Sequence, residues 1–423
     1  MLAHKIELKP NNKQKTYFQK ACGISRLAWN WGLANWEKQY QEGLKPSGMA
    51  LKKEFNAIKK EQFQFTYEVT KYASQQPFIQ LQEAYNRFFK KLGGKPKFKK
   101  KNKSIDSFYI GGDQIKVIGK KVKIPNLGLV RLKEEIRFDG KISNATVSRI
   151  ADKWFISFAI KPAMSYHETC ENQASVGIDL GINHLAVLSN GSFIDSPKPL
   201  KKNLKKLKRL SRQLSKKQHS RKKGDTTPKS NNYIKHSLKV AKLHKRVADI
   251  RKDFLHKFTT YLTDNFQYIS IETLNVKGMM SNGKLSRAIS DIGMYEFKRQ
   301  LLYKSELKGN YILENDKWFA SSKTCPHCGN NKADLTLKDR IYECLDCKMV
   351  KTDRDFVASI NLHNQLGKVL PEVTPVEITA LNQEARLIDL TSIVEAGNKH
   401  HHLSNCARSE EHTSELQSHL MIS

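Results

Sequence analysis

The chain has 423 residues, of which 74 are Lys or Arg and 41 are Asp or Glu, so its formal net charge is +33. A surplus of this size repels itself in a compact fold and indicates a polyanionic partner, nucleic acid first, although a merely basic and well-solvated surface is the plainer alternative. No apolar run approaches the ~18 residues of a membrane helix, and the N-terminus carries no secretion signal. We therefore expect a cytoplasmic protein with no membrane partner.

The first part of the chain combines strand and helix patterns. A strand pattern near residue 5 precedes apolar residues at helical spacing, with Pro77 at a helix start or kink. Short alternating runs broken by glycine follow and favour a small β-barrel. We predict a barrel formed by residues 1–10 and 105–165, an inserted helical bundle at residues 11–92, and an exposed basic connector at residues 93–104.

The second part of the chain is typical of an α/β domain. The run SVGIDLGINHLAVLSNGSFIDS predicts consecutive strands, FQYISIETL predicts another buried strand, and DFVASINLHNQL predicts a helix. Residues 198–223 hold 13 Lys or Arg and no acid, with leucines on one stripe, and a second helical pattern follows them. These two helices predict a basic antiparallel hairpin. The fold class is therefore α+β and multidomain.

Four cysteines form two C-x2-C pairs separated by fifteen residues, and they are Cys325, Cys328, Cys344 and Cys347. In a reducing compartment this spacing predicts a four-thiolate zinc ribbon, here at residues 321–349. An iron–sulfur cluster uses the same residue type but usually a different spacing. Because four ligands close the coordination sphere, we expect this zinc to be structural.

Three carboxylates stand in apolar surroundings. Asp179 interrupts VGIDLGI, Glu272 interrupts YISIETL, and Asp355 opens the helix DFVASINL. Each one alone could be a strand-end or helix-cap carboxylate, and Asp is favoured at a helix start for capping alone. Two strands and a helix N-terminus can also bring the three together, and such a cluster binds two Mg²⁺ ions for phosphodiester hydrolysis.

The segments that carry these residues are similar to the motifs of the TnpB family, transposon-encoded relatives of the compact type V CRISPR effectors. The matching motifs are GIDLG, IETLNVKGM, SSKTCPHCGNN with YECLDC, and DRDFVASINL. The resemblance covers about residues 3 to 399. It implies an RNA-guided DNA endonuclease in which a guide RNA from the transposon end pairs with the target, the protein reads a short adjacent motif in double-stranded DNA, and one RuvC site cuts both strands.

The resemblance also implies domains and cofactors. It assigns an RNase H-like RuvC domain, split between residues 174–320 and 350–370, with the zinc ribbon inserted. The barrel becomes a wedge-like domain and the helical bundle a recognition domain. Asp179, Glu272 and Asp355 become catalytic ligands of two Mg²⁺ ions, for which Mn²⁺ could substitute, and the four cysteines become Zn²⁺ ligands.

Several residues are predicted to contact nucleic acid. Base pairing would supply sequence specificity, so the protein needs a basic channel and only a small surface for base readout. Ser74, Gln75 and Gln76 are candidates for duplex readout, with a helix cap before Pro77 as the alternative. The channel candidates are Lys97, Lys99, Lys100, Lys205, Arg209 and Arg212. Arg340 falls where the family has an arginine near the site, and is predicted either to contact phosphate or to be a surface charge of the ribbon hairpin.

One departure and three rival functions bear on this interpretation. The family pattern after the last aspartate is D-x-N-A-A, whereas this chain has Val357 in place of the asparagine, which bears on cleavage efficiency. A nuclease-weak or inactive RNA-guided regulator would be expected to lose a carboxylate. A DNA transposase is disfavoured by the ribbon between Glu272 and Asp355, and a zinc-ribbon scaffold without catalysis is the third rival.

The remaining expectations concern partners and the C-terminus. A transposase encoded by the same element is an expected partner if the element retains one, and monomer and dimer stay open. Residues 371–423 are expected to be disordered, because the composition shifts after Lys399 and no apolar period follows.

Overall fold

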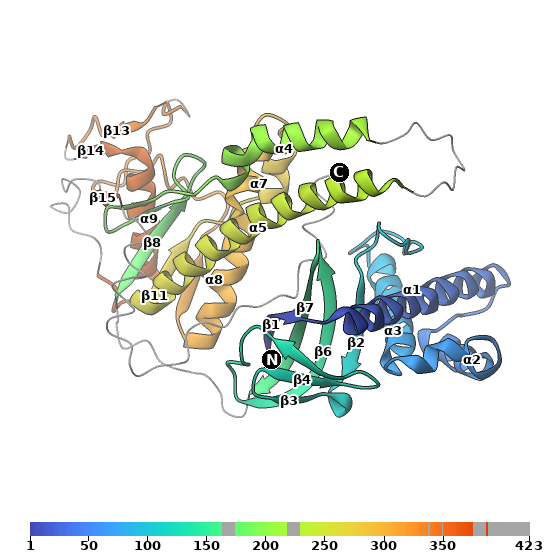
Figure 1. Cartoon of the computed structure of the whole chain (residues 1–423). Helices are drawn as coiled ribbons and strands as arrows, with labels where there is room; N and C mark the ends of the chain where they lie inside the picture. The colour runs from blue at the N-terminus through green and yellow to red at the C-terminus, as the bar shows by residue number, and fades with distance from the viewer. Residues whose placement is uncertain (163–173, 218–228, 337–338, 349, 375–385, 388–423) are drawn as a thin grey trace. The chain divides into compact units, whose positions relative to one another are not determined.

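The structure is a computed structural model that describes residues 1–162, 174–217, 229–336, 339–348, 350–374 and 386–387 (Figure 1). The described residues form two compact units, one within Met1–Ser165 and one within Tyr166–Ser404. Both units combine helices with β-sheet, which confirms the predicted α+β, multidomain class. No helix in these ranges is both long and apolar enough to span a membrane.

The first unit is built on a seven-stranded antiparallel sheet of order β2-β6-β7-β1-β5-β4-β3. Its strands are β1 (Leu2–Lys9), β2 (Ser107–Gly111), β3 (Lys116–Ile118), β4 (Lys121–Ile124), β5 (Gly128–Leu132), β6 (Gly140–Ile150) and β7 (Lys153–Pro162). The N-terminal strand β1 pairs with both β5 and β7. The predicted union of this strand with the later strands is therefore confirmed.

The helices inserted between β1 and β2 are α1 (Asn12–Gln41), α2 (Gly48–Gln62), the 3-10 helix η1 (Gln64–Glu68) and α3 (Tyr72–Phe89). A capping box between Asn11 and Gln14 begins α1. Trp36 and Tyr85 stack with ring centroids 4.3 Å apart and join α1 to α3. Pro77 lies inside α3, one turn past its start, so its missing N–H removes one hydrogen bond of the helix.

The predicted closure of the sheet into a barrel is wrong for the described residues. β2 and β3 stand at opposite ends of the strand order, and no described ladder joins them. β3 is too short and too exposed to close a barrel, since Lys116 and Ile118 both face solvent. Helix α1 packs on the sheet instead, with the ring of Phe18 at 5.8 Å from that of Phe108 and 5.1 Å from that of Trp154.

The second unit contains a six-stranded sheet of order β12-β11-β8-β9-β10-β15. Its strands are β8 (Ser175–Leu180), β9 (Ala186–Leu188), β10 (Ser192–Ile194), β11 (Tyr268–Ile271), β12 (Tyr311–Glu314) and β15 (Arg386–Leu387). β8, β11 and β12 are parallel, and β9 is antiparallel to β8. β15 falls within the segment expected to be disordered, and residues 375–385 and 388–423 lie outside the described residues.

The helices of this unit are α4 (Pro199–Lys216), α5 (Asn231–Asn265), α6 (Val276–Met280), α7 (Ser286–Ile292), α8 (Met294–Lys308) and α9 (Arg354–Val369), and a short hairpin of β13 (Ile341–Glu343) and β14 (Lys351–Asp353) precedes α9. α4 and α5 form the predicted basic hairpin (Figure 1). Val176 and Ile178 of β8 share an apolar core with Phe258 of α5 and Phe297 of α8.

Helix α9 packs on the face of β8 opposite to this apolar core. Gly177 faces α9, because it alternates with Val176 and Ile178 along the strand. A Cβ atom at Gly177 would overlap the backbone oxygen of Ser359 and the backbone nitrogen of His363. The absence of a side chain therefore lets α9 approach the strand closely.

We expect Gly177→Val to destabilise the second unit by about 3 kcal/mol or more, because neither backbone can yield to the added atoms. Urea denaturation followed by circular dichroism measures the loss. The matched control is Gly283→Ala, whose added Cβ meets nothing within 4 Å, and which should stay within ~0.5 kcal/mol of the wild type. Equal stability of Gly177→Val and the wild type would contradict this packing.

Candidate functional site

Two of the three predicted carboxylates lie on neighbouring parallel strands. The register pairs Ile178 of β8 with Ile271 of β11, so Asp179 and Glu272 follow directly at the same edge of the sheet. The carboxylate of Glu272 accepts a hydrogen bond from the backbone N–H of Leu180 at 3.1 Å, which fixes it beside the end of β8. The third carboxylate, Asp355, lies in the first turn of α9, which packs across β8.

The three carboxylates influence one another electrostatically. Burial raises the pKa of Asp179 well above its usual range, and the negative charges of Glu272 and Asp355 raise it further. Burial, with the charge of Asp355, also raises the pKa of Glu272 to about 7, although the Leu180 N–H opposes the shift. Both side chains still keep some contact with solvent. Partly desolvated carboxylates that repel one another fit a divalent cation, which would relieve the repulsion.

Asp355 does not serve as the helix cap. The cap of α9 is Asp353, whose side chain accepts hydrogen bonds from the backbone N–H groups of Asp355 at 2.8 Å and Phe356 at 3.2 Å. The carboxylate of Asp355 instead pairs with two arginines. A carboxylate oxygen of Asp355 lies 3.2 Å from a guanidinium nitrogen of Arg354, and the other lies 3.5 Å from a guanidinium nitrogen of Arg340. The capping alternative therefore applies to Asp353 and leaves Asp355 available for chemistry.

Only one of these two arginines was predicted from the sequence. Arg340 was predicted near the site and lies beside Asp355, with its side chain half exposed, while its contact with phosphate stays a prediction. Arg354 was missed, although it directly precedes Asp355. Its guanidinium group also donates to the backbone oxygen of Thr336 at 3.2 Å, so one arginine joins the carboxylate to the loop before β13.

The raised pKa values predict how metal-free stability depends on pH. The folded protein holds a proton on Glu272 that the unfolded chain releases near pH 4.5, so this stabilisation is present below pH 4.5 and is lost as the pH rises through about 7. The shift at Glu272 corresponds to a change on the order of 3 kcal/mol. In chelator, the melting temperature should decrease less between pH 5 and pH 8 for Glu272→Gln than for the wild type.

Magnesium should reverse this trend, because its binding replaces the protons. We expect Mg²⁺ to raise the melting temperature of the wild type more at pH 8 than at pH 5, and to have little effect on Glu272→Gln at either pH. A wild type and a Glu272→Gln variant with the same pH profile would contradict the assignment of the raised pKa to this site.

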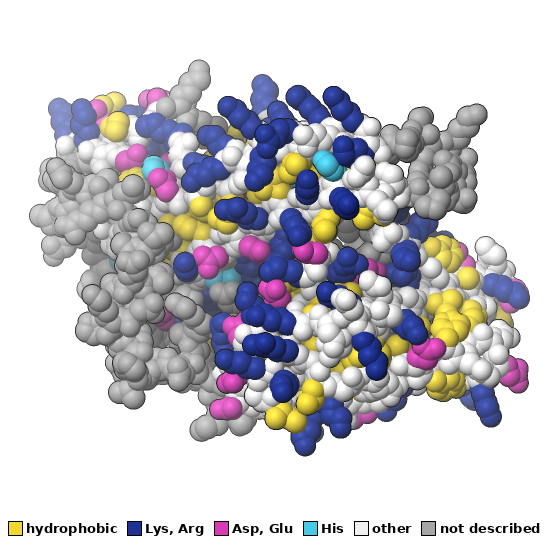
Figure 2. Space-filling model, in the orientation of Figure 1, with side chains coloured by type: hydrophobic (Ala, Val, Ile, Leu, Met, Phe, Trp, Pro, Cys, Tyr) yellow, Lys and Arg dark blue, Asp and Glu magenta, His cyan; other side chains and the backbone are white. Residues whose placement is uncertain are grey.

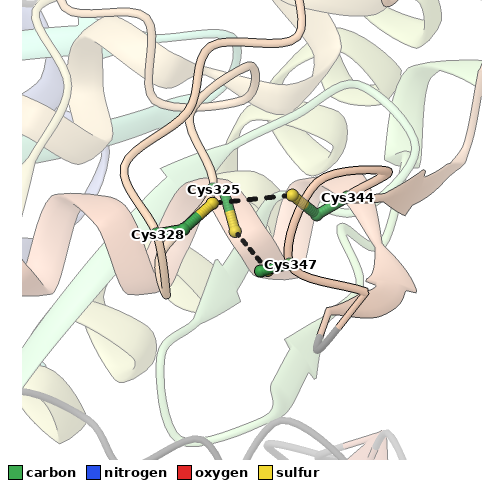
Figure 3. A group of neighbouring side chains, drawn as sticks. All are labelled: Cys325, Cys328, Cys344 and Cys347. Atoms are coloured by element: carbon green, nitrogen blue, oxygen red, sulfur yellow. Dashed lines mark hydrogen bonds between the residues drawn. The ribbon is translucent and has the colours of Figure 1, made fainter.

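The four predicted cysteines converge on one point (Figure 3). The sulfur of Cys325 lies 3.7 Å from that of Cys347, and the sulfur of Cys328 lies 3.6 Å from that of Cys344. Tetrahedral zinc with Zn–S bonds of about 2.3 Å requires sulfur separations near these values. Backbone N–H groups of Cys347 and Asp346 lower the pKa of Cys344 to about 7, which favours the thiolate that binds metal.

The cysteine cluster and helix α9 share one apolar core. Cys325 and Cys344 pack with Tyr342 of β13, with Val350 just before β14, and with Phe356, Val357 and Ile360 of α9. Val357 is fully buried there, so it supports the ribbon through packing. The side chain of Asn361, which the sequence analysis missed, donates to the backbone oxygens of Ser321 at 2.7 Å and Thr324 at 2.6 Å and fastens α9 to the segment that enters the ribbon.

Helix α4 presents the predicted basic surface. Lys205, Arg209 and Arg212 line an open groove of about 390 Å³ together with Lys208, Gln213 and Lys216, and Figure 2 shows Lys and Arg side chains gathered over α4 and α5. The start of α4 is held by Asp291 of α7, whose carboxylate accepts the backbone N–H groups of Leu200 and Lys201, both at 2.9 Å. The groove is therefore attached to the segment that follows Glu272.

The three residues predicted to read double-stranded DNA differ in their exposure to solvent. Ser74 is buried, and its hydroxyl accepts from the ammonium group of Lys59 at 3.0 Å and donates to the backbone oxygen of Lys71 at 3.1 Å. Its prediction as a base contact is therefore wrong in this conformation. Gln75 lines a pocket of about 380 Å³ whose wall also includes Lys71 and Gln114. Gln76 is partly exposed but does not line that pocket.

The basic connector contains one lysine with an internal role. The ammonium group of Lys99 lies 3.9 Å above the ring of Trp29, and burial, followed by the charge of Arg26, lowers its pKa to about 8. Its prediction as a phosphate contact is not supported by this placement, because the charge already meets an aromatic face. Lys97 and Lys100 are exposed and keep their predicted role open.

The chain matches three family models. The model described as "Probable transposase" matches residues 155–283, and the one described as "Cas12f1-like, TNB domain" matches residues 295–362. The third, "Helix-turn-helix domain", matches residues 1–45, where the structure has strand β1 and the single long helix α1.

Relatives that match more than four fifths of the chain show which family it belongs to. The chain is 30% identical over 359 residues to "Putative RNA-guided DNA endonuclease InsQ" of Escherichia coli, which covers 81% of this chain and 87% of that protein. The chain belongs to the TnpB family. A second TnpB relative, "Putative RNA-guided DNA endonuclease" of Streptomyces pristinaespiralis, is 32% identical over 370 residues, covering 85% of this chain and 88% of the relative.

Two further matches are more distant or shorter. "TnpB-like protein L79" of Acanthamoeba polyphaga mimivirus is 32% identical over 145 residues, which cover 32% of this TnpB chain and 27% of the viral one. A solved structure, "Cryo-EM structure of the Cas12f1-sgRNA-target DNA complex", has 14% identity and a TM-score of 0.49 and covers 83% of each chain.

Proposed function

We propose that this TnpB protein is an RNA-guided, metal-dependent DNA endonuclease of a transposable element that cuts double-stranded DNA beside a short adjacent motif. The observation that carries the proposal is that Asp179 and Glu272 end neighbouring parallel strands, where burial, with the negative charge of Asp355 on α9, raises the pKa values of both. The names of the two whole-chain relatives support the same activity.

The second unit would supply the chemistry. Its strand order, with β9 antiparallel between β8 and β10 and with β11 and β12 parallel to β8, supports an RNase H-like RuvC domain split between residues 174–320 and 350–370. The cysteine cluster supports a zinc ribbon at residues 321–349. The first unit would supply the wedge-like sheet, residues 1–10 and 105–165, with the recognition helices of residues 11–92 and the connector of residues 93–104.

The carboxylates would hold two Mg²⁺ ions, with Mn²⁺ as a substitute, which supply water activation and stabilisation of the leaving oxygen when bound. Asp179 and Glu272 must lose their protons to bind a cation, so activity should rise toward neutral pH. Arg340 and Arg354 hold the carboxylate of Asp355 in the metal-free protein. Both guanidinium groups are suited to donate hydrogen bonds to a phosphate once a cation binds the carboxylate.

The partners would be a guide RNA from the transposon end and a double-stranded target. The groove along α4 offers Lys205, Arg209 and Arg212 to a nucleic-acid backbone, and contact with phosphates there would be independent of sequence. The pocket that includes Gln75 offers polar side chains to base edges. Base pairing with the guide would supply most of the sequence specificity.

An RNA-guided DNA-binding regulator with weak cleavage is the second candidate. Two observations favour it: Val357 is an apolar residue in place of the family asparagine, and Asp355 is occupied by two arginines. A DNA transposase, the description of one matching family model, is the third. The ribbon that shares a core with α9 supports the nuclease over the transposase.

A cleavage assay on a randomised library separates these candidates. The chain is purified with its bound RNA, the RNA is sequenced, and the complex is incubated with Mg²⁺ and plasmids that carry the guide target beside random flanking bases. The nuclease should cut a subset with one shared adjacent motif. A regulator would bind that subset without cutting, and a transposase would join strands independently of the guide.

A further inference from the structure

Trp318 is the most exposed tryptophan in the described chain. Its side chain is 81% exposed, whereas Trp29, Trp36 and Trp154 are buried in the first unit. Exposure of so large an apolar ring is unfavourable in water, because burying it would gain the transfer energy of its area. Tryptophan is enriched at interfaces, where its ring packs on a partner, so a ring exposed to this degree is available for such a contact.

The position of Trp318 relates it to the carboxylates. It follows β12, which runs parallel to β11, and the backbone N–H of Asn315 donates to the oxygen of Ile271, the residue before Glu272, at 2.9 Å. The side-chain amide of Asn315 donates to the same oxygen at 3.0 Å. Three residues of chain span at most ~10 Å. Trp318 therefore stands close to the sheet edge that carries Asp179 and Glu272.

The loop that carries Trp318 is fixed at both ends. The backbone N–H of Trp318 donates to the side chain of Asp316 at 2.7 Å, and the backbone N–H of Phe319 donates to the backbone oxygen of Asp316 at 3.1 Å. Beyond the ring, Asn361 of α9 holds Ser321 through a hydrogen bond of 2.7 Å. The tryptophan is thus presented on a short, hydrogen-bonded turn, which lowers the entropy lost when a ligand binds it.

The cation beside Trp318 favours an anionic partner. The ammonium group of Lys317 lies 4.4 Å from the centre of the ring. An aromatic ring combined with cations is the usual arrangement for binding the bases and phosphates of a single strand. An apolar protein surface would gain less, because it would desolvate the ammonium group.

We propose that Trp318 is a base-stacking platform that holds single-stranded DNA beside the carboxylate site. The inference rests on the proposed function, since it assigns the strand to be cut to this surface. A base stacks on the exposed indole while the neighbouring phosphates extend toward Asp179 and Glu272. Trp318 acts as a positioning residue for the strand, and stacking makes its contribution tolerant of base sequence.

The test uses the full chain with its guide RNA, in chelator so that no strand is cut, and an oligothymidylate of about a dozen nucleotides at raised salt, where backbone charge contributes less. Binding should quench the tryptophan fluorescence of the wild type. Trp318→Ala should lose the quenching and bind about 5- to 100-fold more weakly. Trp318→Phe should also lose the quenching but keep affinity within about threefold, because a smaller ring still stacks.

An oligonucleotide of the same length with abasic sites is the matched probe. Wild type and Trp318→Ala should bind it equally, because it offers no base to stack. Tyr295→Ala is the matched control variant, since Tyr295 is 62% exposed on α8 of the same unit, and it should bind both probes as the wild type does. Equal affinity of Trp318→Ala and the wild type for the thymidylate would overturn the proposal, as would an equal loss on the abasic probe.

The outcome is separable from that of the proposed function, because binding is read in chelator. Quenching by the thymidylate without any later cleavage in Mg²⁺ would support the platform and contradict the nuclease. Cleavage without quenching would support the nuclease and overturn the platform. A change in oligomeric state of Trp318→Ala, with unchanged DNA binding, would assign the ring to a protein partner and overturn the proposal as well.

Discussion

Removal of zinc is expected to unfold the ribbon and to abolish DNA cleavage. The apparent free energy of zinc binding to such sites is about 10–16 kcal/mol, far more than the small core of the ribbon could replace. The loss would extend to α9, because Phe356, Val357 and Ile360 pack with the cysteines. Cys344→Ser should therefore contain almost no zinc by elemental analysis, and residues 321–362 should exchange their amide hydrogens rapidly.

Cys22→Ala is the control for this prediction. Cys22 is buried in the first unit and is not one of the four clustered cysteines, so this variant should keep one zinc per chain and its cleavage activity. A Cys344→Ser variant that kept both the protection of α9 and its cleavage activity would contradict the assignment of a structural metal to the cluster.

Asp179→Asn is expected to lower the rate of DNA cleavage by at least ~10³-fold, equivalent to about 4 kcal/mol of activation free energy. The substitution keeps the size of the side chain but removes the charge that would bind a cation between β8 and α9. Affinity for guide RNA and target DNA should be unchanged, because the basic groove of α4 does not include Asp179. Single-turnover cleavage and gel-shift titration measure the two effects separately.

Asp195→Asn is the matched control in the same unit. Asp195 is 55% exposed and pairs with His184 at 2.8 Å, so neutralising it should leave the cleavage rate within about twofold, as expected for a surface substitution. Undiminished cleavage by Asp179→Asn would remove the carboxylate site from the mechanism, and a parallel loss of DNA binding would show that the substitution acts on the fold.

Much of the site could be predicted because its signals are local. The C-x2-C spacing predicts a metal site directly, and its four ligands are Cys325, Cys328, Cys344 and Cys347. Asp179 and Glu272 each interrupt an apolar strand, and parallel neighbours bring such positions to one edge. Alternating hydrophobicity also predicted strand β1 and the strands of residues 107–162, although it does not contain which of them pair.

The remaining features depend on contacts between distant residues. Whether Asp353 or Asp355 caps α9 is decided by side-chain direction, which the pattern DRD does not contain. Ser74 was expected to face DNA, but the ammonium group of Lys59, fifteen positions earlier, reaches its hydroxyl. Within the described residues the sheet of the first unit is open and Phe18 of a helix packs on it, whereas the alternating pattern of the strands is the same in open and closed sheets.

The most direct test of the central claim is to change the guide segment of the bound RNA and to measure where the purified complex cuts. With Mg²⁺ present, the wild type should cut a plasmid at the new matching sequence beside the same adjacent motif, and should leave the original target intact. Cutting that stays at the original target, or that proceeds equally with a scrambled guide, would contradict RNA-guided cleavage by this chain.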